Sequence, residues 1–369
     1  MNPLKQVEAL GQSIWLDYIR RDLMTSGELR RLIKKDGLRG ITSNPAIFEK
    51  AIVASHEYEA DIQRMVAQDK GAREIYEALS QRDVQMAADE FRPLYDRTDT
   101  RDGYVSLEVN PRLAHDSSGT IEEARRLWTA LNRPNVFIKV PATREGLPAI
   151  RKLISEGINV NVTLIFGLPR YRQVAEAYVA GMEARMAQGK PVQHIASVAS
   201  FFLSRIDTIV DPLLEQLADQ GGPDEDTAKK AHGRVAIASA KMAYQIYKEI
   251  AGSARFKKLA AKGARGQRLL WASTGTKNPA YSDVKYIEEL IGPDTVNTVP
   301  QETLTAYRDH GNPRLCLEDN LTEAAWVMAR LGKMGIRLVQ MTQRLEDEGV
   351  EKFNQPFDKL MENLASFAT

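Results

Sequence analysis

Two short stretches, Val136-Phe137-Ile138-Lys139-Val140 and Val160-Asn161-Val162-Thr163-Leu164-Ile165-Phe166, are apolar or β-branched at nearly every position. A strand with one face in water alternates polar and apolar residues, and these two stretches lack a strict alternation. Such runs are typical of parallel strands that are covered on both faces. The segments around them are longer, charged and helical in period. The sequence therefore predicts an α/β fold built on a parallel sheet.

Outward from these stretches, the same kind of short segment recurs along the chain, always separated by helical segments. The eight segments are 14–17, 40–44, 104–109, 135–142, 160–166, 194–202, 268–274 and 294–300. Eight strand–helix units predict a (β/α)8 TIM barrel. The main alternative is a doubly wound open sheet, which often carries Gly-x-Gly-x-x-Gly after its first strand. Here Tyr18-Ile19-Arg20-Arg21 follows instead, which favours the barrel.

We expect residues 1–369 to form a single (β/α)8 barrel domain, with 302–369 as a helical C-terminal extension packed on it. The chain after position 300 is longer than one closing helix needs at about 1.5 Å per residue. Thr25-x-x-Glu28 and Thr120-x-x-Glu123 resemble capping boxes that begin helices. Residues 229–250 are expected to form one long helix.

Composition bears on where the protein acts. Fifty basic and 49 acidic residues leave a net charge of +1, which gives no indication of nucleic-acid or anionic-membrane binding. The single cysteine, Cys316, excludes disulfides within the chain and favours a reducing compartment. No apolar run approaches the roughly 20 residues of a membrane span, and residues 1–17 lack a signal-peptide pattern. We expect a soluble, cytoplasmic protein; the sequence gives no oligomeric state.

Familiar metal and hydrolase motifs are missing. The five histidines form no His-x-x-x-His pair, and one cysteine cannot build a cluster, so no metal site is expected. There is no Gly-x-Ser-x-Gly motif to anchor a hydrolase triad.

Polar residues stand at the ends of seven predicted strands, with one parity within each strand. They are Asp17, Thr42, Asn44, Ser106, Glu108, Lys139, Asn161, Thr163, Ser200 and Ser273. Alternate strand residues of a barrel point inward, and catalytic groups lie at the carboxyl ends of the strands. Strand ends are also often polar simply because they meet loops and solvent. If the barrel forms, these side chains converge on one mouth.

Lys139 is the most informative of them because lysine is rarely buried without a partner. One interpretation is structural, with the ammonium paired to a carboxylate or reaching solvent. The other is catalytic: burial disfavours the charged amine, and a neutral amine can attack a carbonyl to form an imine. Asp17 and Glu108 suit the proton transfers that such chemistry needs, although each could also be an exposed loop carboxylate.

Five segments resemble the transaldolases, specifically a longer bacterial type within the class I Schiff-base aldolase superfamily. The segments are Gly40-Ile41-Thr42-Ser43-Asn44-Pro45, Val136-Phe137-Ile138-Lys139-Val140-Pro141-Ala142-Thr143, Gly157-Ile158-Asn159-Val160-Asn161-Val162-Thr163-Leu164, Ser200-Phe201-Phe202-Leu203-Ser204-Arg205 and, near the C-terminus, Leu345 to Phe353. The resemblance implies a barrel without metal or organic cofactor, with sugar phosphates as partners. It also implies a reaction of the non-oxidative pentose phosphate pathway. In that reaction a dihydroxyacetone unit moves from sedoheptulose 7-phosphate to glyceraldehyde 3-phosphate, giving erythrose 4-phosphate and fructose 6-phosphate.

The resemblance also implies roles. Lys139 is the nucleophile, Asp17 exchanges the hydroxyl proton during carbon–carbon cleavage, and Glu108 works through a water that Thr163 positions. The implied substrate-binding residues are Thr42, Asn44, Asn161, Ser200 and Phe202, and the implied phosphate-binding residues are Arg205, Ser273 and Lys277.

Lys277 is a departure from the family pattern. Many members have Ser-Phe-Arg after strand seven, with the arginine on phosphate, whereas this chain has Ser273-Thr274-Gly275-Thr276-Lys277. Lys277 takes the cationic role across a short insertion, or it is an ordinary solvated loop lysine. A lysine binds phosphate as a point charge, without the planar fork of arginine.

Two rival functions stay open at this point. Fructose-6-phosphate aldolases release free dihydroxyacetone, but they tend to lack the strand-three glutamate and to have tyrosine at the position of Phe202. A barrel that only binds sugar phosphate, with Lys139 in a structural ion pair, is the second rival.

Overall fold

All eight predicted segments form strands in the computed structural model, which describes residues 2–53 and 55–367. Each strand pairs in parallel with the next, and β8 closes the barrel on β1. The strands are β1 Gln12–Asp17, β2 Gly40–Thr42, β3 Tyr104–Glu108, β4 Val136–Pro141, β5 Val160–Ile165, β6 Ser197–Phe202, β7 Arg268–Ala272 and β8 Thr295–Val299. The predicted (β/α)8 barrel is confirmed, and the open sheet is excluded.

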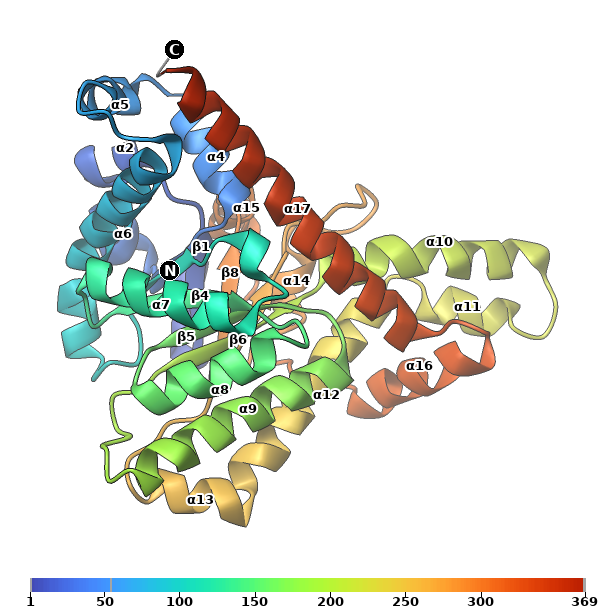
Figure 1. The fold of residues 1–369 in the computed structure, drawn as a ribbon. Coiled ribbons are helices and arrows are strands. Elements are labelled where there is room, and N and C mark those ends of the chain that lie inside the picture. Colours follow the sequence, from blue (N-terminus) through green and yellow to red (C-terminus); the bar gives the residue numbers. More distant parts are fainter. Residues whose placement is uncertain (1, 54, 368–369) are drawn as a thin grey trace.

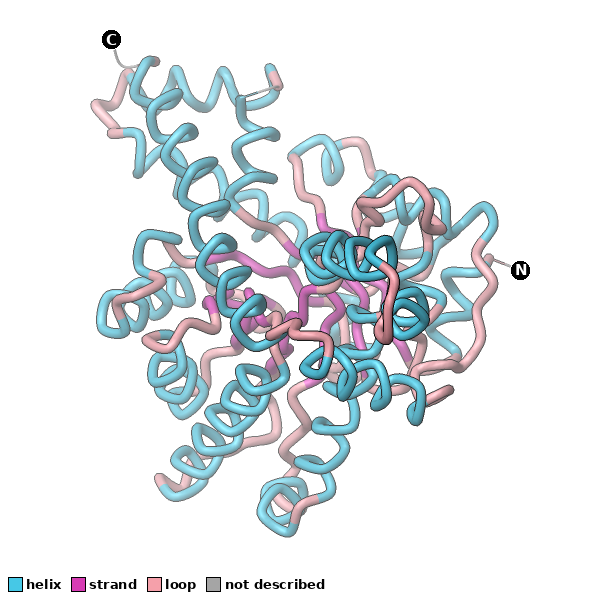
Figure 2. The backbone as a smooth tube through the Cα atoms, turned by 90° about the vertical axis from the view of Figure 1, so that its right-hand side faces the viewer, coloured by secondary structure: helices cyan, strands magenta, loops and turns pink. Residues whose placement is uncertain are grey.

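Helices surround the strands on all sides, so the sheet lies at the centre of the molecule (Figure 2). They are α1 Pro3–Ala9, α2 Arg21–Thr25, α3 Glu28–Arg31, α4 Pro45–Val53, α5 Glu59–Val66, α6 Ala72–Arg97, α7 Ser117–Leu131, α8 Gly146–Glu156, α9 Leu168–Ala187, α10 Ser204–Gln220, α11 Glu225–Ala231, α12 Val235–Gly252, α13 Ala254–Ala260, α14 Lys285–Glu288, α15 Gln301–His310, α16 Leu321–Lys333 and α17 Leu338–Ser366. Short turns of other helix types are η1 Leu32–Asp36, η2 His56–Tyr58 and η3 Pro111–Leu113. None of the helices in the described part of the chain combines the length and the apolar character that a bilayer crossing requires.

Aromatic rings fill the lower part of the barrel interior. Trp15, Tyr104 and Phe137 come from three different strands and stack on one another, with ring centroids 4.4 Å apart for Tyr104 and Phe137 and 6.0 Å apart for Trp15 and Phe137. Successive side chains of a strand point to opposite faces. The residues two positions further along, such as Asp17 and Lys139, therefore stand on the same inner face, above these rings.

Gly40 at the start of β2 leaves room for this stack. A Cβ placed on Gly40 would lie 2.6 Å from two atoms of the Trp15 ring and 2.8 Å from the Tyr104 carbonyl oxygen. The indole therefore occupies the space that a side chain at position 40 would need. Gly40 is required here for close approach, since its φ is not positive.

Three local predictions were wrong. Residues 229–250 form two helices, because the chain turns at Gly233, whose φ is +70° and whose N–H donates to Asp211. Thr25 ends α2, and Gly27 precedes α3. Thr120 lies inside α7, where its hydroxyl donates to the Leu113 carbonyl, and Asp116 caps that helix instead. In the last two cases the residue that precedes the helix is not the predicted threonine.

The C-terminal helix α17 runs diagonally along the outside of the barrel from α16 to α4 (Figure 1). It contacts β5 and η3 on the way. Gly349 faces Leu164 at the end of β5, and Glu346 accepts hydrogen bonds from Arg170 of α9 at 2.8 and 3.2 Å. The extension therefore lies against the carboxyl ends of the strands.

Gly40→Ala should destabilise the protein by about 1–3 kcal/mol, because the added methyl group overlaps the Trp15 ring and the Tyr104 backbone. Urea unfolding followed by tryptophan fluorescence measures the change. Gly332→Ala in α16 is the matched control, since nothing lies within 4 Å of its added Cβ. The control should be neutral or stabilising by up to about 1 kcal/mol. Equal effects of the two substitutions would contradict the close approach at Gly40.

Candidate active site

Lys139 lies inside the barrel mouth and is 4% exposed. Its Nζ donates a hydrogen bond of 3.1 Å to the backbone carbonyl of Ser43, at the end of β2. Glu108 Oε2 lies 3.5 Å from the same nitrogen, and the Phe353 ring centroid of α17 lies 5.4 Å away. The amine is thus desolvated, close to one carboxylate and covered by one aromatic ring.

Glu108 lies directly opposite Lys139 in the β3–β4 register. It is 7% exposed, and no described residue donates a hydrogen bond to its Oε2. Burial raises the pKa of Glu108 to about 7, against the opposing charge of Lys139, and the charge of Asp17 raises it further. Near neutral pH this carboxyl group is therefore able both to donate and to accept a proton.

Asp17 ends β1 and is partly exposed. Its carboxylate accepts a 2.6 Å hydrogen bond from the Thr42 hydroxyl, which lies 2.7 Å from the Thr298 hydroxyl of β8. Burial raises the pKa of Asp17, and the charge of Lys139 opposes that shift. Asp17, Glu108 and Lys139 therefore act on one another electrostatically, as the convergence of strand ends predicts.

A hydrogen-bonded chain crosses the mouth beside Lys139. Asn161 donates to the Ser106 hydroxyl at 3.0 Å, and the Ser200 hydroxyl donates to Asn161 Oδ1 at 2.7 Å. All three side chains are almost completely buried. Asn44 is engaged differently, because its Oδ1 accepts from the Ile47 N–H at the start of α4.

Thr163 and Phe202 complete the inner wall. Thr163 is fully buried, and its hydroxyl has no hydrogen-bond partner in the described part of the chain. A bulge follows in β5, with Leu164 at φ +61°, and bulges often redirect side chains next to active sites. Phe202 is 9% exposed and packs against Phe166 with ring centroids 5.0 Å apart.

Arg205 lies in the first turn of α10, and Ser273, directly after β7, lies beside that end of the helix. Ser273 has φ +54°, and its hydroxyl lies 2.9 Å from that of Ser204, the residue before Arg205. Arg205 is partly buried, and no described residue accepts a hydrogen bond from its guanidinium group. Burial lowers the pKa of Arg205, and Glu348 of α17 opposes this shift. An unpaired guanidinium at a helix N-terminus forms an anion-binding arrangement.

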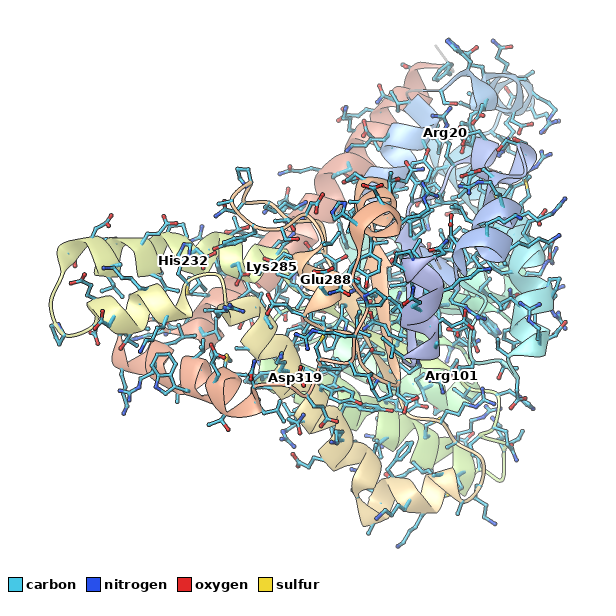
Figure 3. All side chains as sticks on the ribbon, turned by 180° about the vertical axis from the view of Figure 1, so that it is seen from behind. Arg20, Arg101, His232, Lys285, Glu288 and Asp319 are labelled. Atoms are coloured by element: carbon cyan, nitrogen blue, oxygen red, sulfur yellow. The ribbon has the colours of Figure 1, made fainter. Side chains whose placement is uncertain are left out.

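Lys277 extends from the loop after β7, is exposed and has no ion-pair partner in the described part of the chain. Its charge nevertheless lowers the pKa of Asp17, so it acts on the barrel mouth. The loop that carries Lys277 is fixed further along by a buried ion pair of 3.1 Å between Lys285 and Asp207 of α10. Tyr286 also donates to Asp207, at 2.7 Å. Lys285 lies close to the barrel, whereas His232 lies further out along the arm formed by α10 and α11 (Figure 3).

Three contacts of the site were not predicted from the sequence. The Ser43 carbonyl that accepts from Lys139 is a backbone group, and no residue type encodes it. Thr298 belongs to β8, where we identified no site residue. Phe353 is 214 positions from Lys139 in the sequence, and the family resemblance of Leu345 to Phe353 did not place it against Lys139.

Among the described residues, no group of three or more His, Cys, Asp or Glu side chains is arranged to hold a metal ion. The polar groups of the mouth are one amine, two carboxyls, hydroxyls and amides. Such a set suits imine formation and proton transfer.

Comparison with known proteins gives the family. The model of the family described as transaldolase/fructose-6-phosphate aldolase matches residues 14–364. The chain belongs to this family. A transaldolase of Trichodesmium erythraeum is 50% identical over 367 residues, which cover 98% of this chain and 97% of the relative. Transaldolase 2 of Nostoc sp. is 48% identical over 369 residues, covering 99% and 97%, and a transaldolase of Thiobacillus denitrificans is 46% identical over 361 residues, covering 98% and 99%.

These relatives match along nearly their whole length, and they show that the chain is a transaldolase enzyme of this family. The resemblance noted from a few strand segments is therefore confirmed.

The raised pKa of Glu108 predicts a carboxylic acid that titrates with a midpoint near pH 7. Its folded pKa lies above the unfolded value of about 4.3, so its stabilising contribution is present below that value and is lost as the pH rises to 7. Difference infrared spectra between pH 5 and pH 9 should show loss of a protonated-carboxyl band that is absent from Glu108→Gln. A midpoint below pH 5 would contradict the assignment.

Proposed function

We propose that the enzyme transfers a dihydroxyacetone unit from sedoheptulose 7-phosphate to glyceraldehyde 3-phosphate through an imine on Lys139. The products are erythrose 4-phosphate and fructose 6-phosphate, and the reaction belongs to the non-oxidative pentose phosphate pathway. The observation that carries the proposal is the environment of Lys139. It is a buried amine at a barrel mouth, 3.5 Å from Glu108 and electrostatically coupled to Asp17.

The first steps of the reaction form the imine. Lys139 Nζ adds to the ketose C2 carbonyl, and the resulting carbinolamine loses water. Glu108, whose pKa of about 7 suits both acid and base, supplies and recovers the protons through a water that Thr163 helps to hold. The unpartnered Thr163 hydroxyl and the unpartnered Glu108 Oε2 support this assignment, because a water could satisfy both.

The later steps of the reaction break a carbon–carbon bond and transfer the dihydroxyacetone unit. Asp17 takes the proton of the C4 hydroxyl, the C3–C4 bond breaks, and its electron pair flows into the protonated imine to give an enamine on Lys139. The aldose leaves. The enamine then attacks the aldehyde carbon of the acceptor, Asp17 returns a proton to the new hydroxyl, and hydrolysis frees the ketose and Lys139.

We assign the hydrogen-bonded set of the mouth to the substrate hydroxyls and the α10 end to the phosphate. The first group comprises Thr42, Asn44, Asn161 and Ser200, with Phe202 as an apolar wall. The second comprises Arg205, Ser273 and Lys277. The support is that Arg205 and Lys277 are cations without a partner among the described residues, at or near the mouth.

Release of free dihydroxyacetone, as in fructose-6-phosphate aldolases, is the alternative within the same family. The buried Glu108 and the aromatic pair of Phe202 with Phe166 favour transfer. Rapid release of dihydroxyacetone from fructose 6-phosphate without any acceptor would instead identify an aldolase.

Lys139→Ala should lower exchange activity to below about one thousandth, because it removes the nucleophile. Incubation with fructose 6-phosphate and borohydride, followed by mass spectrometry, should place a reduced adduct on Lys139 in the wild type and none in Lys139→Ala. Lys277→Met is the control for a second lysine near the mouth, and at saturating substrate it should keep the adduct. An adduct on another lysine, or retained exchange in Lys139→Ala, would refute the imine.

Arg205→Gln should lower kcat/KM for fructose 6-phosphate as donor about 10- to 100-fold, the value of a charge-assisted hydrogen bond of about 1.5–3 kcal/mol. Lys277→Met should have a smaller effect, since a lysine binds as a point charge. Neither should change the much slower reaction of unphosphorylated fructose. Arg172→Gln, on the outer face of α9 and paired with Glu249, is the control. Equal losses for both sugars would remove these residues from the phosphate site.

A further inference from the structure

A second concave basic surface lies at the other end of the barrel. A cavity of about 550 Å³ opens between α1, η1 and α6, next to the start of β2. Five basic side chains line it, namely Lys5, Arg30, Lys34, Arg39 and Arg97. We call it the basic cavity. Arg39 lies immediately before β2, so the basic cavity is at the amino-terminal end of the strands, away from Lys139. Figure 3 marks the two ends by Arg101 before β3 and Arg20 after β1.

Positive charge in the basic cavity exceeds negative charge. Among the described residues that line it, the carboxylates are Glu8 and Glu90, against five cations. Glu90 accepts two hydrogen bonds from Arg30, and Glu8 is ion-paired with Arg39. Lys5, Lys34 and Arg97 have no ion-pair partner in the described part of the chain. The excess of three charges in one cavity contrasts with +1 for the whole chain.

Arg39 makes this cluster different from scattered surface lysines. Its side chain is 11% exposed, so the guanidinium is largely withdrawn from water. No described residue accepts a hydrogen bond from its buried Nε. Burial lowers the pKa of Arg39, the charge of Asp102 opposes that shift, and the like charges of Arg97 and Arg268 add to it. Arg39 already has Glu8 as one partner, and a second anion beside it would satisfy its Nε and reduce the repulsion from Arg97.

The walls of the basic cavity are suited to more than a bare anion. Ile33, Pro93 and Leu94 line it together with the basic groups. The volume is within the range of small-molecule sites, about 300–1,000 Å³. We propose that the basic cavity binds a small organic phosphate, with the phosphate on Arg39, Arg97 and Lys34 and the carbon part on this apolar wall. The site is separate from the catalytic mouth.

The test uses the full-length enzyme and α-glycerol phosphate, which has no carbonyl and cannot form an imine. Arg205→Gln serves as the background in calorimetric titrations, because it removes the phosphate-binding arginine assigned to the mouth. In this background the enzyme should still bind the probe. Adding Lys34→Glu and Arg97→Glu should weaken binding at least about tenfold, since two charge-assisted contacts are lost. Both side chains are exposed, so the fold should persist.

The matched control is the pair Lys257→Glu and Lys262→Glu in and after α13, which changes the net charge equally on another face. This pair should leave binding within about twofold, because exposed charges further away than the Debye length of roughly 10 Å are screened. Equal weakening by both pairs, or no binding in the Arg205→Gln background, would overturn the proposal.

Inorganic phosphate is the second probe and should bind more weakly than α-glycerol phosphate. If the two probes bind with equal affinity, the apolar wall has no part in recognition and the proposal of an organic phosphate is refuted. Exchange activity at saturating substrate should be unchanged in Lys34→Glu/Arg97→Glu. A negative result in the binding titrations would therefore refute the basic cavity as a binding site without bearing on the imine at Lys139.

Discussion

The stack of Trp15, Tyr104 and Phe137 determines what the rest of the barrel can contain. Three rings from β1, β3 and β4 fill the lower interior, and they fit only because Gly40 has no side chain. The two-residue period of each strand then places the next inward side chains above the rings, out of contact with bulk water. Lys139 follows Phe137 in this way. Its burial is therefore a consequence of the packing below it, and the environment of this amine depends on the aromatic rings beneath it.

Burial in turn fixes the electrostatics of the mouth. Lys139 and Glu108 are buried and Asp17 is partly exposed, and in this arrangement one cation acts on two carboxyl groups. Burial raises the pKa of both acids, while the ammonium opposes each shift. Desolvation raises the free energy of each charged group. The state in which Glu108 holds a proton near pH 7 is therefore lower in free energy than the state in which both acids and the amine are charged. A mobile proton next to a buried amine is what carbinolamine dehydration requires.

Most of this could be predicted from the sequence because the information is local to each strand. The apolar runs gave eight strands, and the parity of polar residues within each run gave the inner face of the mouth. What could not be predicted depends on contacts between distant segments. Phe353 reaches Lys139 only because α17 crosses the strand ends, and the Ser43 carbonyl contributes no side chain to recognise. The turn at Gly233 depends on Asp211 from α10, so helical periodicity alone could not reveal it.

The two ends of the barrel differ in how many of their cations have an ion-pair partner. At the amino-terminal end, Arg101, Arg265 and Arg268 are each paired with an aspartate at 2.6–3.0 Å, so they stabilise the closed strand ends and leave no charge for a ligand. Arg205 and Lys277 at the mouth end have no such partner. Of the two, Arg205 is partly buried, and an unpaired, partly buried cation costs free energy that a bound anion would recover. At the amino-terminal end Arg97 and Lys34 are exposed, and it is the lack of an ion-pair partner alone that distinguishes them from the paired arginines around them.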